Sequence, residues 1–222
     1  MSAPPPRTRS PPATKHHERD LPKAFSLLGH PAVYNLSQRA VGATLARAIA
    51  IEALDPQAGQ RILDIGCGPA CYFDRLPRGD YFGFDTDADY IVDATRRLGD
   101  HGRFFAEPYT EARRAELPPF DRIMLMGLLH HLDDTACEGL LDLIARSIAT
   151  GGRVTSLDTV LFEGQSTLAR LLAKNDRGDF IRYPDGFLAL ARKRFGKVEH
   201  RIVGDTWRIP SSHFLTVFSD PR

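Results

Sequence analysis

From residue 61 onward the chain alternates short apolar segments with helical ones, and this alternation constrains the fold more than any other feature. Five segments read as strands: residues 61–65, 81–84, 103–106, 121–126 and 153–158. Helices are expected between them, at about residues 70–76, 88–98, 109–116 and 134–148. Because parallel strands need a crossover connection, this order predicts parallel βαβ units and a doubly wound α/β sheet.

Both ends of the chain depart from this alternation. Residues 1–20 hold five prolines and six charged residues, which predicts a disordered tail. Residues 21–56 show apolar spacings of three and four and predict an N-terminal helical cap of two helices, broken near Gly42. After a helix at about 185–195, two strand-like segments follow at 197–205 and 211–219. Their short link predicts an antiparallel C-terminal hairpin on a mostly parallel seven-stranded sheet.

Composition bounds the class of protein. The 222 residues suit one domain, and a net charge of +1 lacks the basic bias of nucleic-acid-binding proteins. Three cysteines argue against a disulfide framework, and no second cysteine pair has the spacing of zinc ligands, so we expect no metal site. Without a long apolar run or an apolar leader, we expect a cytoplasmic protein and no membrane partner.

The segment RILDIGCGPA at 61–70 ends a predicted strand in a small-residue turn. Such a turn places backbone N–H groups and a helix N-terminus against a ligand. The G-x-G-x-x-G pattern of nicotinamide dinucleotide-binding proteins is incomplete, because Cys71 stands where the third glycine would be. The carboxylate of Asp64 would also repel a pyrophosphate, whereas it suits an ammonium group.

Two further segments lie where parallel strands end. Asp85 ends the second strand, nineteen residues after Gly66, where an acidic side chain can bind both hydroxyls of a ribose. Asp87 can cap the following helix, which leaves Asp85 for a ligand. In FDRIMLMGLLHHLDD, residues 120–134, a buried strand runs into Gly127 and a loop with paired histidines. This loop lies at the carboxyl edge of the sheet, where α/β proteins bind ligands.

Together, DIGCG at 64–68, Asp85 and LHHL at 129–132 resemble the motifs of class I S-adenosylmethionine-dependent methyltransferases. GGRV at 151–154 and the terminal hairpin are also typical of that superfamily. The resemblance covers residues 25–220. It implies a Rossmann-like fold with S-adenosylmethionine as the cofactor.

The resemblance also implies an organisation and a set of binding residues. One methyltransferase domain would span 21–222, with the cofactor-binding half at 57–160 and the substrate-side half at 161–222. The glycine turn would pack against the methionine and ribose of the cofactor. Expected cofactor-binding residues, by position, are Tyr34, Asp64, Gly66, Cys67, Gly68, Asp85, Glu107, Met126 and Gly127.

Individual roles follow from the same resemblance. Asp64 would lie near the amino group, Asp85 at the ribose hydroxyls and Glu107 at the adenine amino group. Tyr34 would close over the cofactor, and Met126 would line its methionine side. Glu107 can equally be a solvated loop acid, and Tyr34 a plain core residue.

Methyl transfer to a hydroxyl or a protonated amine is helped by a base. The candidates are His131, which we place first, then His130 and Asp158, with His213 also considered. In this superfamily a histidine after the fourth strand often only shapes the loop.

The segment 162–187 is longer than a simple crossover, so part of it is expected to cover the substrate. Arg177 and Arg182 in it could bind a carboxylate or phosphate, although surface charges are an equal alternative. His213 in the terminal hairpin completes the expected substrate residues.

The expected acceptor is a small molecule methylated on oxygen or nitrogen. Residues 126–129 lack the Asn/Asp-Pro-Pro-aromatic stretch of enzymes that methylate amino groups of bases, so nucleic acid is not the expected partner. The alternatives are an RNA or protein methyltransferase that relies on a partner, a catalytically inactive cofactor-binding regulatory subunit, and a nicotinamide dehydrogenase. The oligomeric state is open.

Overall fold

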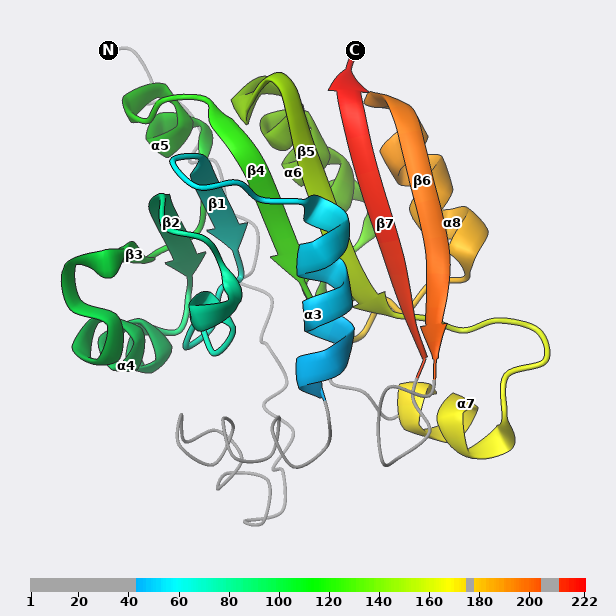
Figure 1. The fold of residues 1–222 in the computed structure, drawn as a ribbon. Coiled ribbons are helices and arrows are strands. Elements are labelled where there is room, and N and C mark those ends of the chain that lie inside the picture. Colours follow the sequence, from blue (N-terminus) through cyan, green and yellow to red (C-terminus); the bar gives the residue numbers. More distant parts are fainter. Residues whose placement is uncertain (1–42, 175–177, 205–211) are drawn as a thin grey trace, which may run out of the picture.

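The structure, a computed structural model, describes residues 43–174, 178–204 and 212–222. Its centre is a seven-stranded sheet in the order β3-β2-β1-β4-β5-β7-β6 (Figure 1). The strands are β1 Arg61–Ile65, β2 Asp80–Asp85, β3 Arg103–Ala106, β4 Phe120–Met126, β5 Ile148–Thr159, β6 Phe195–Gly204 and β7 Ser212–Pro221. All five strands expected after residue 61, and both strands of the C-terminal hairpin, are confirmed.

Strands β1 to β5 pair in parallel, and β7 is antiparallel to both of its neighbours. The last strand of the chain lies between β5 and β6, so the hairpin closes back onto the sheet. The strand order reverses at β1, between β2 and β4, and this switch point places a crevice at the carboxyl ends of β1 and β4. The expected doubly wound, mostly parallel sheet is confirmed.

Helices cover both faces of the sheet (Figure 1). They are α3 Ala43–Leu54, α4 Ala88–Leu98, α5 Glu111–Glu116, α6 Asp134–Ser147, α7 Thr167–Lys174 and α8 Pro184–Arg192. One expected helix, at 70–76, is wrong: only the 3-10 turn Phe73–Arg75 forms there. The backbone has positive φ at Gly66, Gly68 and Ala70, and these left-handed residues delay the return to a helical path.

Two helices begin at side chains that the sequence marks as caps. Asp87 Oδ1 accepts from the backbone N–H groups of Asp89 (3.0 Å) and Tyr90 (3.2 Å), as expected. Ser166 Oγ accepts from the N–H of Ala169 at 3.2 Å and starts α7. Each bond satisfies a donor that the first helical turn would otherwise leave without a partner.

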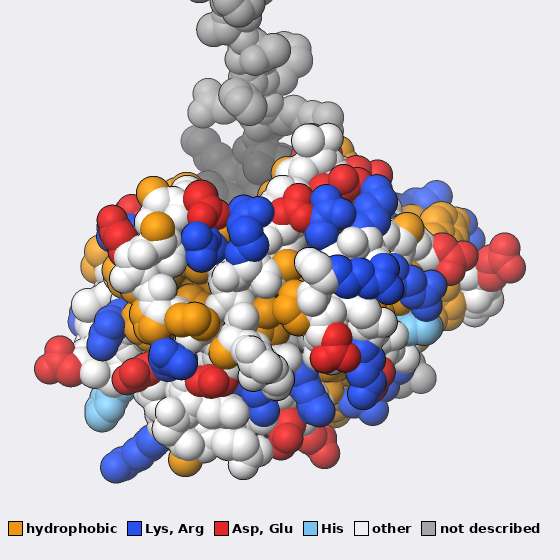
Figure 2. All heavy atoms as spheres, turned by 90° about the horizontal axis from the view of Figure 1, so that it is seen from above, with side chains coloured by type: hydrophobic (Ala, Val, Ile, Leu, Met, Phe, Trp, Pro, Cys, Tyr) orange, Lys and Arg blue, Asp and Glu red, His pale blue; other side chains and the backbone are white. Residues whose placement is uncertain are grey.

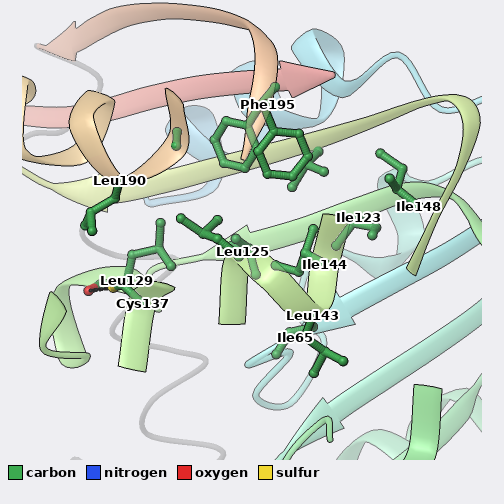
Figure 3. Packing of buried hydrophobic residues seen from close by; sticks show 14 of the residues in the cluster. Ile65, Ile123, Leu125, Leu129, Cys137, Leu143, Ile144, Ile148, Leu190 and Phe195 are labelled. Atoms are coloured by element: carbon green, nitrogen blue, oxygen red, sulfur yellow. Dashed lines mark hydrogen bonds between the residues drawn. The ribbon is translucent and has the colours of Figure 1, made fainter. Parts of the chain in front are cut away.

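The larger apolar core lies between the sheet and helices α6 and α8 (Figure 3). Ile123 and Leu125 of β4 meet Ile144 of α6 there, and the Phe195 ring of β6 packs at a tilt against Phe218 of β7 with ring centroids 5.0 Å apart. A second core lies under α3 on the opposite face. The two cores hold β1 and β4 between them, which fixes the crevice at the ends of these strands.

The opposite end of the sheet carries the amino ends of the parallel strands (Figure 2). Basic and acidic side chains are mixed on this face, around an apolar patch. Two arginines at this end of the sheet bind the end of α3: Arg122 Nε donates to the Asp55 carbonyl (3.1 Å) and Arg153 Nη1 to the Ala53 carbonyl (3.4 Å). These guanidinium groups satisfy carbonyls that a helix C-terminus leaves unpaired.

Several expectations fall outside the described residues. They are the tail at 1–20, the first cap helix, the link at 205–211, and the roles of Tyr34 and Arg177. Within the described ranges, no helix has both the length and the apolar character to cross a membrane.

Candidate functional site

The glycine turn lies where β1 ends, at the switch point of the sheet. Gly66 and Gly68 have φ of +75° and +54°, which side chains other than glycine rarely adopt. A Cβ on Gly66 would come within 3.2 Å of Leu128 Cδ1, whereas a Cβ on Gly68 would meet nothing closer than Tyr90 at 4.0 Å. The turn therefore packs on one side and presents open backbone on the other.

Asp85 is bound to this turn through its carboxylate. Its Oδ2 accepts from the Gly68 N–H at 2.8 Å, and its Oδ1 accepts from the Asp87 N–H at 2.9 Å. An ionised carboxylate has about four lone-pair sites, so each oxygen can accept one further bond. The side chain is fixed in place and retains capacity for two hydroxyl donors. Asp87 serves as the helix cap, as the sequence indicates.

Asp64 is fully buried at the end of β1. Its Oδ2 accepts from the hydroxyls of Tyr72 (2.9 Å) and Tyr81 (2.5 Å). Its Oδ1 is buried and has no hydrogen-bond partner among the described residues. Burial raises the pKa of Asp64 to about 7, against the opposing effect of the two tyrosine hydrogen bonds. A buried acceptor of this kind suits a cationic or N–H ligand.

Two other predicted cofactor residues, Cys67 and Glu107, have side chains that contact other parts of the protein. The Cys67 side chain is 3% exposed and packs toward Gly83, so only its backbone lines the turn. Burial also raises the pKa of its thiol far above the ordinary value. Glu107 follows β3 and is half-buried, and its carboxylate is paired with the Arg113 guanidinium.

Met126 ends β4, the strand beside β1, and Gly127 follows it. Met126 is buried, and Gly127 has a φ of +84° and donates its N–H to the Leu157 carbonyl at 2.8 Å. A Cβ on Gly127 would lie 3.7 Å from His130 Cε1. The end of β4 thus places the edge of the His130 ring beside the site.

His130 and Asp158 form a buried pair between the ends of β4 and β5. The Asp158 Oδ1 lies 3.0 Å from His130 Nδ1 and also accepts from the His130 backbone N–H at 3.2 Å. Its Oδ2 accepts from Ser156 Oγ at 2.9 Å. The same Ser156 Oγ lies 3.0 Å from Thr216 Oγ1. Both members of the pair are buried, and the network orients Asp158 from two strands.

His131 differs from its neighbour. It is exposed, and its ring lies against His130 with centroids 4.2 Å apart. His213 is on β7 in register with Thr159, one residue beyond Asp158. The structure therefore gathers His130, His131, Asp158 and His213 at one end of the sheet, where His130 contacts both Asp158 and His131.

Arg182 corrects a prediction. Its guanidinium donates to three backbone carbonyls, those of Leu129 (2.8 Å), Phe180 (3.1 Å) and Leu132 (2.6 Å). Two of its nitrogens also lie 2.9 Å and 2.8 Å from the Asp134 carboxylate. With all five N–H groups used and the side chain 10% exposed, Arg182 has no donor left for a substrate anion.

Two partners in the site were not anticipated from the sequence. Tyr72 and Tyr81 hold Asp64 from different segments, and no spacing rule connects them to it. Burial raises the pKa of both phenols well above the ordinary value, so they act only as donors to the carboxylate. Among the described residues, no group of three or more histidine, cysteine or acidic side chains could hold a metal ion.

These features test the fit to S-adenosylmethionine. The open side of Gly68, the spare acceptors of Asp85 and the unsatisfied Asp64 oxygen match a ligand with a ribose and an ammonium group. The geometry does not favour a dinucleotide, since a buried carboxyl group stands at the end of β1, where a pyrophosphate would approach.

Comparisons with known proteins agree with this reading. A family model described as "Methyltransferase domain" matches residues 63–154. No curated protein matches the chain in sequence. Among solved structures, human N-acetylserotonin methyltransferase in complex with S-adenosylmethionine is 16% identical with a TM-score of 0.63, over 89% of this chain and 56% of that one.

Two smaller proteins match over nearly their whole length. A TehB-like methyltransferase from Corynebacterium glutamicum is 20% identical with a TM-score of 0.59, over 86% of this chain and 98% of that one. A Haloferax volcanii chain, solved in complex with the Trm112 methyltransferase activator, is 16% identical with a TM-score of 0.66, over 89% and 97%. At these identities the likeness establishes the fold, and the family model adds the methyltransferase domain. Residues 63–154 therefore match a methyltransferase domain, and the chain shares its fold with S-adenosylmethionine-dependent methyltransferases.

Proposed function

We propose that this methyltransferase acts on an oxygen or nitrogen atom of a small-molecule acceptor. The observation that carries the proposal is the buried His130–Asp158 pair, whose ring edge lies beside Gly127. S-adenosylmethionine supplies an electrophilic methyl group when bound. The protein then has to hold the acceptor in line and, for a hydroxyl or a protonated amine, to take up a proton.

The cofactor roles follow the geometry of the turn. Asp64 Oδ1 would receive the ammonium group, and the spare acceptors of Asp85 would take the ribose hydroxyls. Gly66, Gly68 and the Cys67 backbone would line the methionine and ribose, together with Met126 and Gly127 at the end of β4. Glu107 would reach the adenine amino group with the part of its carboxylate that Arg113 leaves exposed.

His130 is the better base of the two histidines. The 3.0 Å contact places its Nδ1–H toward the Asp158 carboxylate, which makes Nε2 the basic nitrogen of the neutral ring. A carboxylate also stabilises the imidazolium that forms when the ring takes a proton. His131 is exposed, whereas the His130 ring is buried against Asp158, so we place His130 ahead of it.

Exposed apolar and aromatic side chains after β5, one of them joined to His130 through its backbone, support a small acceptor with apolar parts. Phe180 donates its N–H to the His130 carbonyl at 3.0 Å, and its side chain is 42% exposed. Leu168 and Tyr183 in the substrate-side half are also half-exposed. The human neighbour is named for a small-molecule acceptor, N-acetylserotonin, which fits the same reading.

The test has two stages. Calorimetric titration of the full chain with S-adenosylhomocysteine and with NAD establishes which nucleotide binds. A screen of phenol, carboxylate and amine acceptors with radiolabelled S-adenosylmethionine then identifies the acceptor, and His130→Gln is compared with His131→Gln as the matched control. We expect loss of transfer in His130→Gln with unchanged cofactor affinity.

Transfer that requires RNA or an added protein would replace this proposal with the macromolecular alternative. Cofactor binding without transfer to any acceptor would favour a regulatory subunit.

A further inference from the structure

The loop that carries the two histidines is held from outside by the segment that precedes α8. This loop is the 3-10 turn Leu129–His131, which joins β4 to α6. Arg182 donates to the carbonyls of Leu129 and Leu132, one on each side of the histidine pair. A single guanidinium therefore fixes both ends of the histidine turn.

Residues 178–182 add contacts on His130 itself. Gly178 packs so closely that a Cβ there would come within 2.6 Å of the His130 carbonyl oxygen and closer still to the ring. Phe180 donates its N–H to the same carbonyl at 3.0 Å. The Arg182 carbonyl in turn accepts from the Leu161 N–H at 3.2 Å, just beyond β5. The segment is thus joined to both strands that end at the site.

The chemistry of these contacts requires an arginine. The planar guanidinium, with its five N–H donors, reaches three carbonyls and a carboxylate, which a lysine ammonium cannot reproduce. Arg182 Cζ also lies 5.7 Å from the centre of the Phe187 ring, and this ring fixes the guanidinium from the α8 side.

We propose that Arg182 is a positioning residue that holds the His130 ring against Asp158. This inference rests on the proposed function, in which His130 takes the acceptor proton. Arg182 acts through the backbone of the histidine turn, without touching the cofactor or the acceptor. Asp158 on β5 and His131 beside it are titratable groups in contact with the ring.

The experiment measures the ring directly and needs no turnover. The full chain is labelled on histidine Cε1, and the His130 signal, identified by its absence in His130→Gln, is followed against pH by NMR. Arg182→Met is compared with two controls. Asp134→Asn removes the carboxylate partner of Arg182 and keeps its carbonyl bonds, and Arg194→Met removes a paired guanidinium that contacts α6 through Asp142.

In Arg182→Met we expect the His130 signal to move and its titration midpoint to fall by about half a pH unit or more, because the ring loses the carboxylate that stabilises its charged form. Both controls should leave the signal and midpoint in place. An unchanged midpoint in folded Arg182→Met would overturn the proposal and leave Arg182 a purely structural role. If that variant does not fold, Arg182→Lys serves instead, and a wild-type midpoint there has the same meaning. Loss of activity in His130→Gln is tested separately, so failure of the proposed base leaves this readout intact.

Discussion

The buried carboxyl group of Asp64 should make the stability of this protein depend on pH in an unusual direction. Its pKa is raised from an ordinary 3.8 to about 7 in the folded protein, mainly because burial disfavours the charged form. The folded state therefore binds this proton more tightly than the unfolded state. As pH rises through the window between these two values, the free energy of unfolding falls, and the loss levels off above about pH 7.

The magnitude follows from linkage. The full shift corresponds to about 4 kcal/mol, and the part lost between pH 5 and pH 8 is about 3 kcal/mol. Asp64→Asn keeps an oxygen that accepts from Tyr72 and Tyr81 but cannot ionise. The stability of this variant relative to the wild type should therefore rise by about 3 kcal/mol from pH 5 to pH 8. Any constant cost of the new amide cancels in this comparison.

The assay is urea unfolding at several pH values, followed by far-ultraviolet circular dichroism. Asp80→Asn is the matched control, since it removes an exposed carboxyl group at the start of β2. Its stability difference from the wild type should stay constant with pH. A constant difference for Asp64→Asn as well would refute the reasoning, because it would mean that Asp64 ionises as easily in the folded protein as in the unfolded one.

Three further outcomes are expected. Asp85→Ala should raise the dissociation constant of S-adenosylhomocysteine about 100-fold in calorimetry, since two charge-assisted hydrogen bonds are lost. Gly178→Ala should lower the free energy of unfolding, measured by urea unfolding, by about 2–3 kcal/mol, because the new Cβ clashes with His130. In the same assay Gly139→Ala, on an open face of α6, should raise the free energy of unfolding by about 0.5–1 kcal/mol. Cys67 and Cys137 are buried with raised thiol pKa values, so alkylation followed by mass spectrometry should modify them only after unfolding, and rapid modification of the native protein would contradict their placement.

The fold could be predicted because its signals are local. Each strand after residue 61 is a short apolar run, and each helix between strands has its own periodicity, so no long-range information is needed to place them. Asp85 could be assigned for the same reason, since the carboxyl ends of neighbouring parallel strands meet at one edge. The missing helix at 70–76 marks where this local reasoning fails. Its residues have helical composition, but the left-handed backbone that ends at Ala70 prevents a regular helix.

The order of the last strands could not be predicted from such signals. A short link between β6 and β7 indicates an antiparallel pair, but it does not say which member lies next to β5. The structure places β7 there, with Leu157 opposite Leu215 and Ser156 opposite Thr216. The second pair matters for the site, because the Ser156 hydroxyl that contacts Thr216 also donates to Asp158.

Arg182 shows why the contacts of a candidate substrate residue are hard to predict. From the sequence, an arginine in a long crossover segment can equally well bind a substrate anion or bind the backbone carbonyls of a neighbouring loop. The decision depends on carbonyls about fifty positions away, those of Leu129 and Leu132. A backbone carbonyl leaves no mark in the sequence, so a side chain that binds one cannot be recognised there.

The same limit explains the order of the two histidines. His130 and His131 are adjacent and identical in type; from the sequence we expect His131 to be the first candidate for the base, whereas the geometry leads us to propose His130. The backbone of the 3-10 turn makes the difference between the two rings. It directs the His130 ring inward, where Asp158 contacts both the ring Nδ1 and the backbone N–H of His130, and it leaves His131 exposed. Because one carboxylate oxygen binds both groups, a displacement of the turn away from Asp158 would break both bonds. The functional difference between two identical residues therefore depends on how firmly this turn is held, and that is the property that substitution of Arg182 measures.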